Sequence, residues 1–180
     1  MLTLTSSISA KIIAAFGVIF LIVLALGGLS IDRLGMINDL TIATRDNWLP
    51  SSQALGQLRA TIRLYRLAEA RVAIGQGGRD VASYAMQVND ASEAVKKARS
   101  IYESLIDKGT DEERFMRDFD AAWAKYRMTS DRLVRRVAAG GQGDLQAEYF
   151  GEDIKYYAAS VSAVAGAITY NVRSGIDAAS

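Results

Sequence analysis

The residues with the clearest capacity for chemistry are three arginines, Arg59, Arg63 and Arg66, spaced four and three residues apart. In an α-helix this spacing places the three guanidinium groups along one stripe of the surface. Each guanidinium offers a planar fork of donors suited to a carboxylate, and the three repel one another unless negative charge lies between them. Glu69 is the only acid between residues 49 and 78. The row therefore predicts either a site for a small organic anion or a solvated face paired with acids elsewhere.

The composition excludes most catalytic and metal chemistry. The chain has no Cys and no His, which removes thiol nucleophiles, thiolate and imidazole metal ligands, and every His-based catalytic arrangement. Its 21 basic and 20 acidic residues give a net charge of +1, so no strong field recruits nucleic acid. The Gly-Gly-Gln-Gly run at 140–143 lacks the Lys-Ser/Thr ending of a phosphate-binding loop and predicts a hinge. We therefore expect no enzyme, no cofactor and no bound metal.

An uncharged apolar run at 12–31, between Lys11 and Asp32, predicts a transmembrane helix. Twenty helical residues span about 30 Å, which is the thickness of the hydrocarbon core of a bilayer. The alternative is a cleavable signal peptide, whose apolar region is usually shorter. With a retained anchor, we expect residues 1–11 in the cytoplasm and residues 32–180 in the periplasm, on the far side of the inner membrane.

Glycine-containing breaks at 75–78, 108–110 and 140–143 divide the rest of the chain into four segments with helical patterning. In each segment apolar residues recur at steps of three and four, as on the buried seam of a packed helix. Short loops make neighbouring helices antiparallel. The fold class is therefore all-α, an up-down-up-down antiparallel four-helix bundle with an N-terminal transmembrane helix continuous with the first bundle helix. The expected helices span about 32–75, 80–107, 111–139 and 144–180.

Single residues predict where these helices bend, begin and end. Pro50 falls inside the first helix and is expected to bend it, and Glu69 is the one polar residue on that helix's apolar seam. The expected caps are Asp80, Thr110 and Asp144 at helix N-termini and Gly75 and Gly140 at C-termini.

Several short runs resemble a known family. They are Lys11–Gly17 at the entry to the anchor, Asn47–Ser51 and Ala54–Arg59 on the first helix, and Asn171–Gly175 near the end. Together with the anchor and the bundle pattern, they resemble the four-helix-bundle sensor domain of bacterial methyl-accepting chemotaxis proteins over essentially the whole chain. The resemblance implies a periplasmic, homodimeric bundle that binds small attractants or repellents. It also implies a second transmembrane helix, a HAMP linker and a cytoplasmic signalling coiled coil beyond residue 180. The same bundle occurs on sensor histidine kinases and cyclases.

The resemblance also implies a place for the ligand. In this family it binds between the first and fourth helices, often at the dimer interface, where arginines on the first helix meet aromatic residues at the start of the fourth. The matching residues here are Arg59, Arg63, Arg66, Tyr149 and Phe150. The ligand is then an organic acid or amino acid, bound directly or delivered by a periplasmic binding protein, and it acts through a small shift of the helices that return to the membrane.

Two alternatives remain open from the sequence. The arginines instead pair with acids of the second or fourth helix, for which the candidates are Glu148, Glu152 and Asp153. The competing function is a membrane-anchored helical module that holds a periplasmic partner protein, for which we expect an exposed apolar patch without a pocket.

Overall fold

The computed structural model describes residues 15–29, 48–74, 81–141 and 144–179, which fall into two units divided after Ala43. In the first unit, residues 15–29 are helical and exposed. The described part of the chain contains no helix both long and apolar enough to cross a bilayer. The ends of the predicted anchor, residues 12–14 and 30–31, lie outside the described residues, as do residues 32–47 of the predicted first helix, Gly75 and Asp80.

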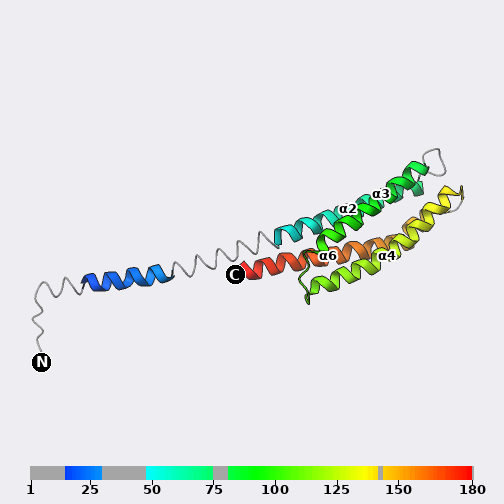
Figure 1. Ribbon diagram of the computed structural model, residues 1–180. Helices are drawn as coiled ribbons and strands as arrows, with labels where there is room; N and C mark the ends of the chain where they lie inside the picture. Colours follow the sequence, from blue (N-terminus) through cyan, green and yellow to red (C-terminus); the bar gives the residue numbers. More distant parts are fainter. Residues whose placement is uncertain (1–14, 30–47, 75–80, 142–143, 180) are drawn as a thin grey trace, which may run out of the picture. The chain divides into compact units, whose positions relative to one another are not determined.

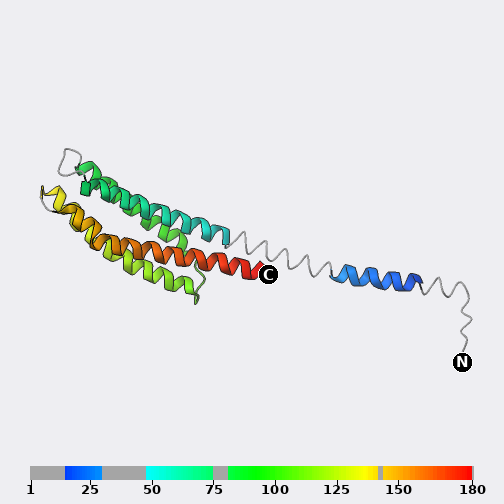
Figure 2. The same cartoon turned by 180° about the vertical axis from the view of Figure 1, so that it is seen from behind.

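The second unit consists only of helices over its described residues. They are α2 (Leu49–Ile74), α3 (Val81–Glu103), α4 (Asp111–Ala138), α5 (Leu145–Phe150) and α6 (Glu152–Ala179). The four long helices alternate in direction, so that α2 begins and α6 ends at the same end of the bundle (Figures 1 and 2). The all-α, up-down-up-down four-helix bundle predicted from the sequence is confirmed.

The bundle is built from two closely packed helix pairs. Helix α2 packs mainly against α3, and α4 packs mainly against α6, while α2 and α6 join the two pairs. Figure 1 shows α2 with α3 above α4 with α6. Of the four pairs of adjacent long helices, α3 and α4 have the sparsest contact. The bundle is therefore least closed along the α3–α4 groove.

The predicted apolar seams form the core. On α2 the spacing of three and four residues places Leu55, Leu58 and Ile62 in the fully buried interior, as expected for a helix that buries one face. Aromatic side chains fill the centre of the bundle, and Tyr65 packs edge-on against Trp123 and Tyr126 with ring centroids 4.8 and 5.3 Å apart. This packing explains why each helix repeats its apolar positions along its whole length.

Local chemistry sets the ends of the helices. Thr110 is the N-cap of α4, and its hydroxyl accepts a hydrogen bond from the backbone N–H of Glu112. Asp144 caps α5 in the same way, through the backbone N–H of Ala147. Gly140 follows the end of α4 with a φ of 71°, the left-handed conformation in which glycine ends helices. Pro50 is the second residue of α2, and the bend predicted at Pro50 would involve residues 32–47, which lie outside the described residues.

The structure differs from the prediction at the fourth helix, where one helix was expected over 144–180. The helix is interrupted at Gly151, which separates α5 from α6. A Cβ atom at Gly151 would lie 2.5 Å from the carbonyl oxygen of Ala147, so the break depends on a residue without a side chain.

Replacing Gly151 by alanine tests this close approach. We expect Gly151→Ala to lower the free energy of unfolding by about 1–3 kcal/mol, because the new methyl group overlaps backbone that cannot swing aside. The matched control is Gly56→Ala at an exposed position of α2, where a Cβ meets nothing within 4 Å. There the higher helix propensity of alanine should raise the free energy of unfolding by roughly 0.5–1 kcal/mol. Urea unfolding measures both changes. A Gly151→Ala protein as stable as Gly56→Ala would mean that the helix runs on through residue 151.

Candidate functional site

The structure does not gather the five predicted site residues into one place. Arg63 is exposed, Phe150 is 62% exposed, and Arg59 is half-buried with an Nε that has no hydrogen-bond partner among the described residues. Arg66 and Tyr149 are buried and touch each other. Only these two of the five meet in a defined arrangement, and they meet inside the bundle.

Arg66 ties α2 to the short helix α5. Its Nη2 donates a hydrogen bond to the carbonyl oxygen of Tyr149 at 2.7 Å, and its guanidinium carbon lies 3.4 Å from the centre of the Tyr149 ring. Because α5 ends at Phe150, the carbonyl of Tyr149 belongs to the last turn, whose carbonyls have no partner within the helix. The arginine supplies that missing donor and stacks on the ring as a cation on an aromatic face.

The same guanidinium forms an ion pair with Glu69 in the interior. Arg66 Nη1 lies 2.8 Å from Glu69 Oε2, and the hydroxyl of Tyr126 on α4 donates to that oxygen as well. The other oxygen, Oε1, has no hydrogen-bond partner among the described residues. Burial raises the pKa of Glu69 to about 7, and the nearby charge of Asp153 adds to the rise. The pair therefore links α2, α4 and α5 through a carboxyl group that titrates near neutral pH.

Arg66 does not form the predicted ion pair with Glu148, Glu152 or Asp153. Glu148 forms an ion pair with Arg136 at 2.8 Å, and Glu152 is exposed. Asp153 is fully buried, and neither of its oxygens accepts a hydrogen bond from the described residues. The partner of Arg66 comes instead from its own helix, one turn along. The sequence did contain a signal for it, because Glu69 is the only polar residue on an otherwise apolar seam.

A second buried polar cluster joins α3, α4 and α6 toward the other end of the bundle. The hydroxyl of Tyr102 donates to Glu112 Oε1 at 2.9 Å, and the side-chain amide of Asn171 donates to the same oxygen and to Tyr102. The other oxygen of Glu112 accepts from the backbone N–H of Asp107. Glu112 thus helps to hold the α3–α4 loop, a role that the capping sequence did not predict.

The comparison with known families decides what kind of bundle this is. Residues 5–179 match the model of the four-helix-bundle sensory module for signal transduction. The chain belongs to this family. No curated protein and no solved structure matches it.

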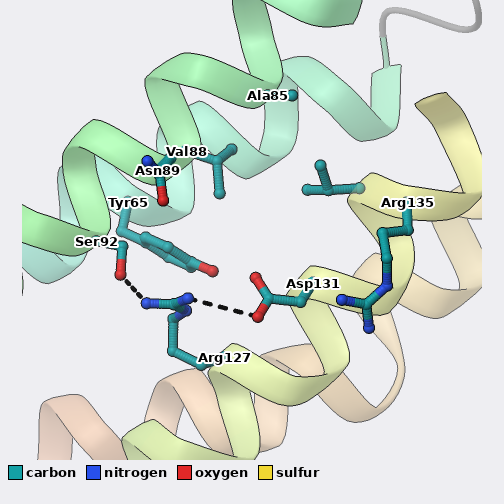
Figure 3. A pocket seen from close by; sticks show the side chains of 9 residues that line it. Tyr65, Ala85, Val88, Asn89, Ser92, Arg127, Asp131 and Arg135 are labelled. Atoms are coloured by element: carbon teal, nitrogen blue, oxygen red, sulfur yellow. Dashed lines mark hydrogen bonds and ion pairs between the residues drawn. The ribbon is translucent and has the colours of Figure 1, made fainter.

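Two cavities of this sensory module lie along the α3–α4 groove, and a third, of about 300 Å³, lies on α6 beside Val172. One cavity of about 170 Å³ is lined by α2, α3 and α4 and contains Tyr65, Arg127 and Asp131 (Figure 3). Another, of about 270 Å³, contains Arg99 and Asp120. No group of acidic side chains among the described residues is placed to hold a metal ion.

The raised pKa of Glu69 predicts a pH dependence of the sensory module's stability. Between about pH 4.5 and pH 7 the unfolded chain releases a proton that folded Glu69 retains, so this residue's contribution to the free energy of unfolding falls as the pH rises. A difference of this size corresponds to up to about 3 kcal/mol. Urea unfolding of the wild type and of Glu69→Gln between pH 4.5 and 7.5 measures it. We expect the wild type to lose stability relative to the variant, and parallel pH profiles would contradict the assignment.

Proposed function

We propose that the chain is the ligand-sensing module of a bacterial methyl-accepting chemotaxis receptor. The observation that carries the proposal is the family match over 5–179, which includes both the apolar run at 12–31 and the whole bundle. In this proposal residues 12–31 anchor the module in the inner membrane and the bundle lies in the periplasm. The module detects a small organic anion, a carboxylate or an amino acid, and passes a helix shift across the membrane.

The outer face of α2 supports a homodimer. Leu64, Leu67 and Ile74 are 57%, 51% and 63% exposed, although the opposite face of the same helix is in the core. Ala60 extends this row toward the start of the helix, at spacings of four, three and seven residues. A row of apolar residues at these spacings is the pattern with which one helix packs along another. The proposed dimer places the α2 helices of two copies against each other.

Such a dimer explains how exposed Arg63 and half-buried Arg59 could hold an anion. Arg63 directly precedes Leu64, its side chain is exposed, and it forms no ion pair among the described residues. Arg59 lies one turn earlier, and its Nε finds no hydrogen-bond partner in the part of the chain that the structure describes. Where two copies of α2 meet, these guanidinium groups approach their counterparts, and a carboxylate between them would offset the repulsion. Phe150 remains a candidate contact for the carbon skeleton of the ligand, since its ring is exposed.

In this proposal Arg66 and Tyr149, the two buried residues of the predicted site, transmit the effect of ligand binding from α2 to α6. Arg66 connects α2 to α5 through Tyr149, and α5 leads through Gly151 into α6, which returns toward the end of the bundle where α2 begins. A ligand that favours one arrangement of α2 over another shifts the population of that arrangement. In the proposal this connection carries the change into α6.

Ligand binding is tested by thermal unfolding of the full chain in mild detergent against a panel of organic acids and amino acids. A ligand at 100 times its Kd stabilises the folded protein by about 2.7 kcal/mol, which shifts the Tm by roughly 5–10 °C for a bundle of this size. We expect Arg63→Ala to abolish the shift and Arg132→Ala, an exposed arginine on α4, to leave it intact. If no acid in the panel stabilises the wild type, direct anion sensing is wrong and a partner protein becomes the better proposal.

The dimer is tested by charging its proposed contact. We expect sedimentation equilibrium to show a wild-type dimer and a monomeric Leu64→Glu/Leu67→Glu double variant, since burying two carboxylates at the contact is costly. The control is Met86→Glu on α3, which is equally exposed but lies on another helix. A wild type that stays monomeric at hundreds of micromolar, with and without ligand, would rule out this interface.

A further inference from the structure

The smaller cavity of the α3–α4 groove has the size of a small metabolite and an amphipathic lining. Its volume of about 170 Å³ equals that of roughly five or six liquid water molecules. Its apolar lining residues are Ala85 and Val88 on α3 and Val134 on α4. Asn89 and Ser92 on α3 add polar groups, and Arg127 and Asp131 on α4 point into the cavity together with the phenol of Tyr65 (Figure 3).

Tyr65 brings an unsatisfied hydroxyl to this cavity. The side chain is fully buried, and its oxygen has no hydrogen-bond partner among the described residues. Ser130 lies close enough to influence the phenol, yet its own hydroxyl is also unpartnered. Burial raises the pKa of Tyr65, so the hydroxyl stays neutral and is available both to donate and to accept. A buried polar group without a partner carries a free-energy cost that a ligand in the cavity would remove.

Arg127 is only partly used by the protein. Its Nη1 donates to the hydroxyl of Ser92, its Nη2 lies 3.4 Å from Asp131, and its Nε has no partner among the described residues. A close charge-assisted hydrogen bond measures about 2.7–2.9 Å, so the contact with Asp131 is loose. The Nε and Nη2 edge of a guanidinium is the side-on fork that binds both oxygens of one carboxylate. This Nε and Nη2 edge of Arg127 can still donate hydrogen bonds to a ligand.

In the other cavity of the groove, the arginine has a full set of hydrogen-bond and ion-pair partners. There Arg99 donates to both oxygens of Asp120, at 3.0 and 2.9 Å, and also pairs with Glu103. These charges are matched within the protein and leave no buried atom of Arg99 without a partner among the described residues. The contrast singles out the cavity at Tyr65 as the one with unmatched polar groups.

We propose that the cavity between α2, α3 and α4 is a second ligand site, within one subunit, for an α-amino acid with a small aliphatic side chain. The carboxylate binds the side-on fork of Arg127, and the ammonium group binds Asp131 and the hydroxyl of Tyr65. The side chain packs on Val88 and Val134. A zwitterion thus inserts into the loose Arg127–Asp131 pair and supplies each of the two charges with an opposite one.

Occupation of this site reaches the buried ion pair through direct contacts. The ring of Tyr65 packs on Trp123 and on Tyr126, and the hydroxyl of Tyr126 donates to Glu69. A ligand that fixes Tyr65 therefore acts on the residues that join α2 to α4. Trp123 also gives the site an intrinsic fluorescence reporter.

Calorimetric titration of the full chain in mild detergent tests the proposal with L-alanine, L-2-aminobutyrate and L-valine. Each is compared with the 2-hydroxy acid of the same skeleton, in which a hydroxyl replaces the ammonium group. We expect at least one amino acid to bind and to change the tryptophan fluorescence, with its hydroxy acid at least about tenfold weaker because the charge on Asp131 is then unmatched. No binding of any of the three at millimolar concentration, or equal binding of the hydroxy acid, overturns the proposal.

Three variants locate the binding. We expect Arg127→Gln to weaken it at least about tenfold and Tyr65→Phe by about three- to tenfold, while Arg132→Gln on the same helix leaves it unchanged. Tyr65→Phe removes a hydroxyl without a partner, so it should bind less well with no fall in Tm, even if Arg127→Gln fails to fold. Binding that survives Tyr65→Phe and is lost in Arg63→Ala would place the amino acid on the surface of α2. That result overturns this site and leaves the proposed sensor function standing.

Discussion

The burial of Glu69 among aromatic rings is the constraint around which the distal half of the bundle is organised. A carboxyl group removed from water is unfavourable unless charge and hydrogen bonds replace its solvation. Arg66 and Tyr126 provide part of that replacement, at Oε2 of Glu69, and in doing so they connect α2 to α4 and α5. The two closely packed helix pairs are thus joined by a polar contact as well as by the apolar core.

The sequence predicted the bundle because a helix that buries one face must repeat its apolar residues every three to four positions. Leu55, Leu58 and Ile62 follow this rule and are fully buried. The break at Gly151 was not predictable in this way, because a glycine within a helical pattern is tolerated at a cost of only about 1 kcal/mol. Whether the helix continues depends on the close approach to the carbonyl of Ala147, which no local pattern encodes.

For the predicted site, too, the sequence pattern could not show which residues are buried. Spacing places Arg63 and Arg66 on one stripe, yet one is exposed and the other is buried, because α5 covers only the edge of α2 that carries Arg66. The direction from which a neighbouring element approaches is a tertiary property. Arg127 and Asp131 drew no attention in the sequence because oppositely charged residues four apart are common on exposed helix surfaces. Their special feature is an incomplete set of partners inside a cavity, which only the structure reveals.

The cluster of Tyr102, Glu112 and Asn171 limits how far the helices can move. An axial slide of α6 by one turn, about 5.4 Å, would carry the amide of Asn171 away from Glu112 and leave that buried carboxylate without one of its donors. With Arg66 and Glu69 fixing the bundle nearer its other end, the helices have one favourable register. In the proposed receptor, a signal along α6 would therefore be a displacement of a fraction of a turn, about 1–2 Å, and not a step of one whole turn.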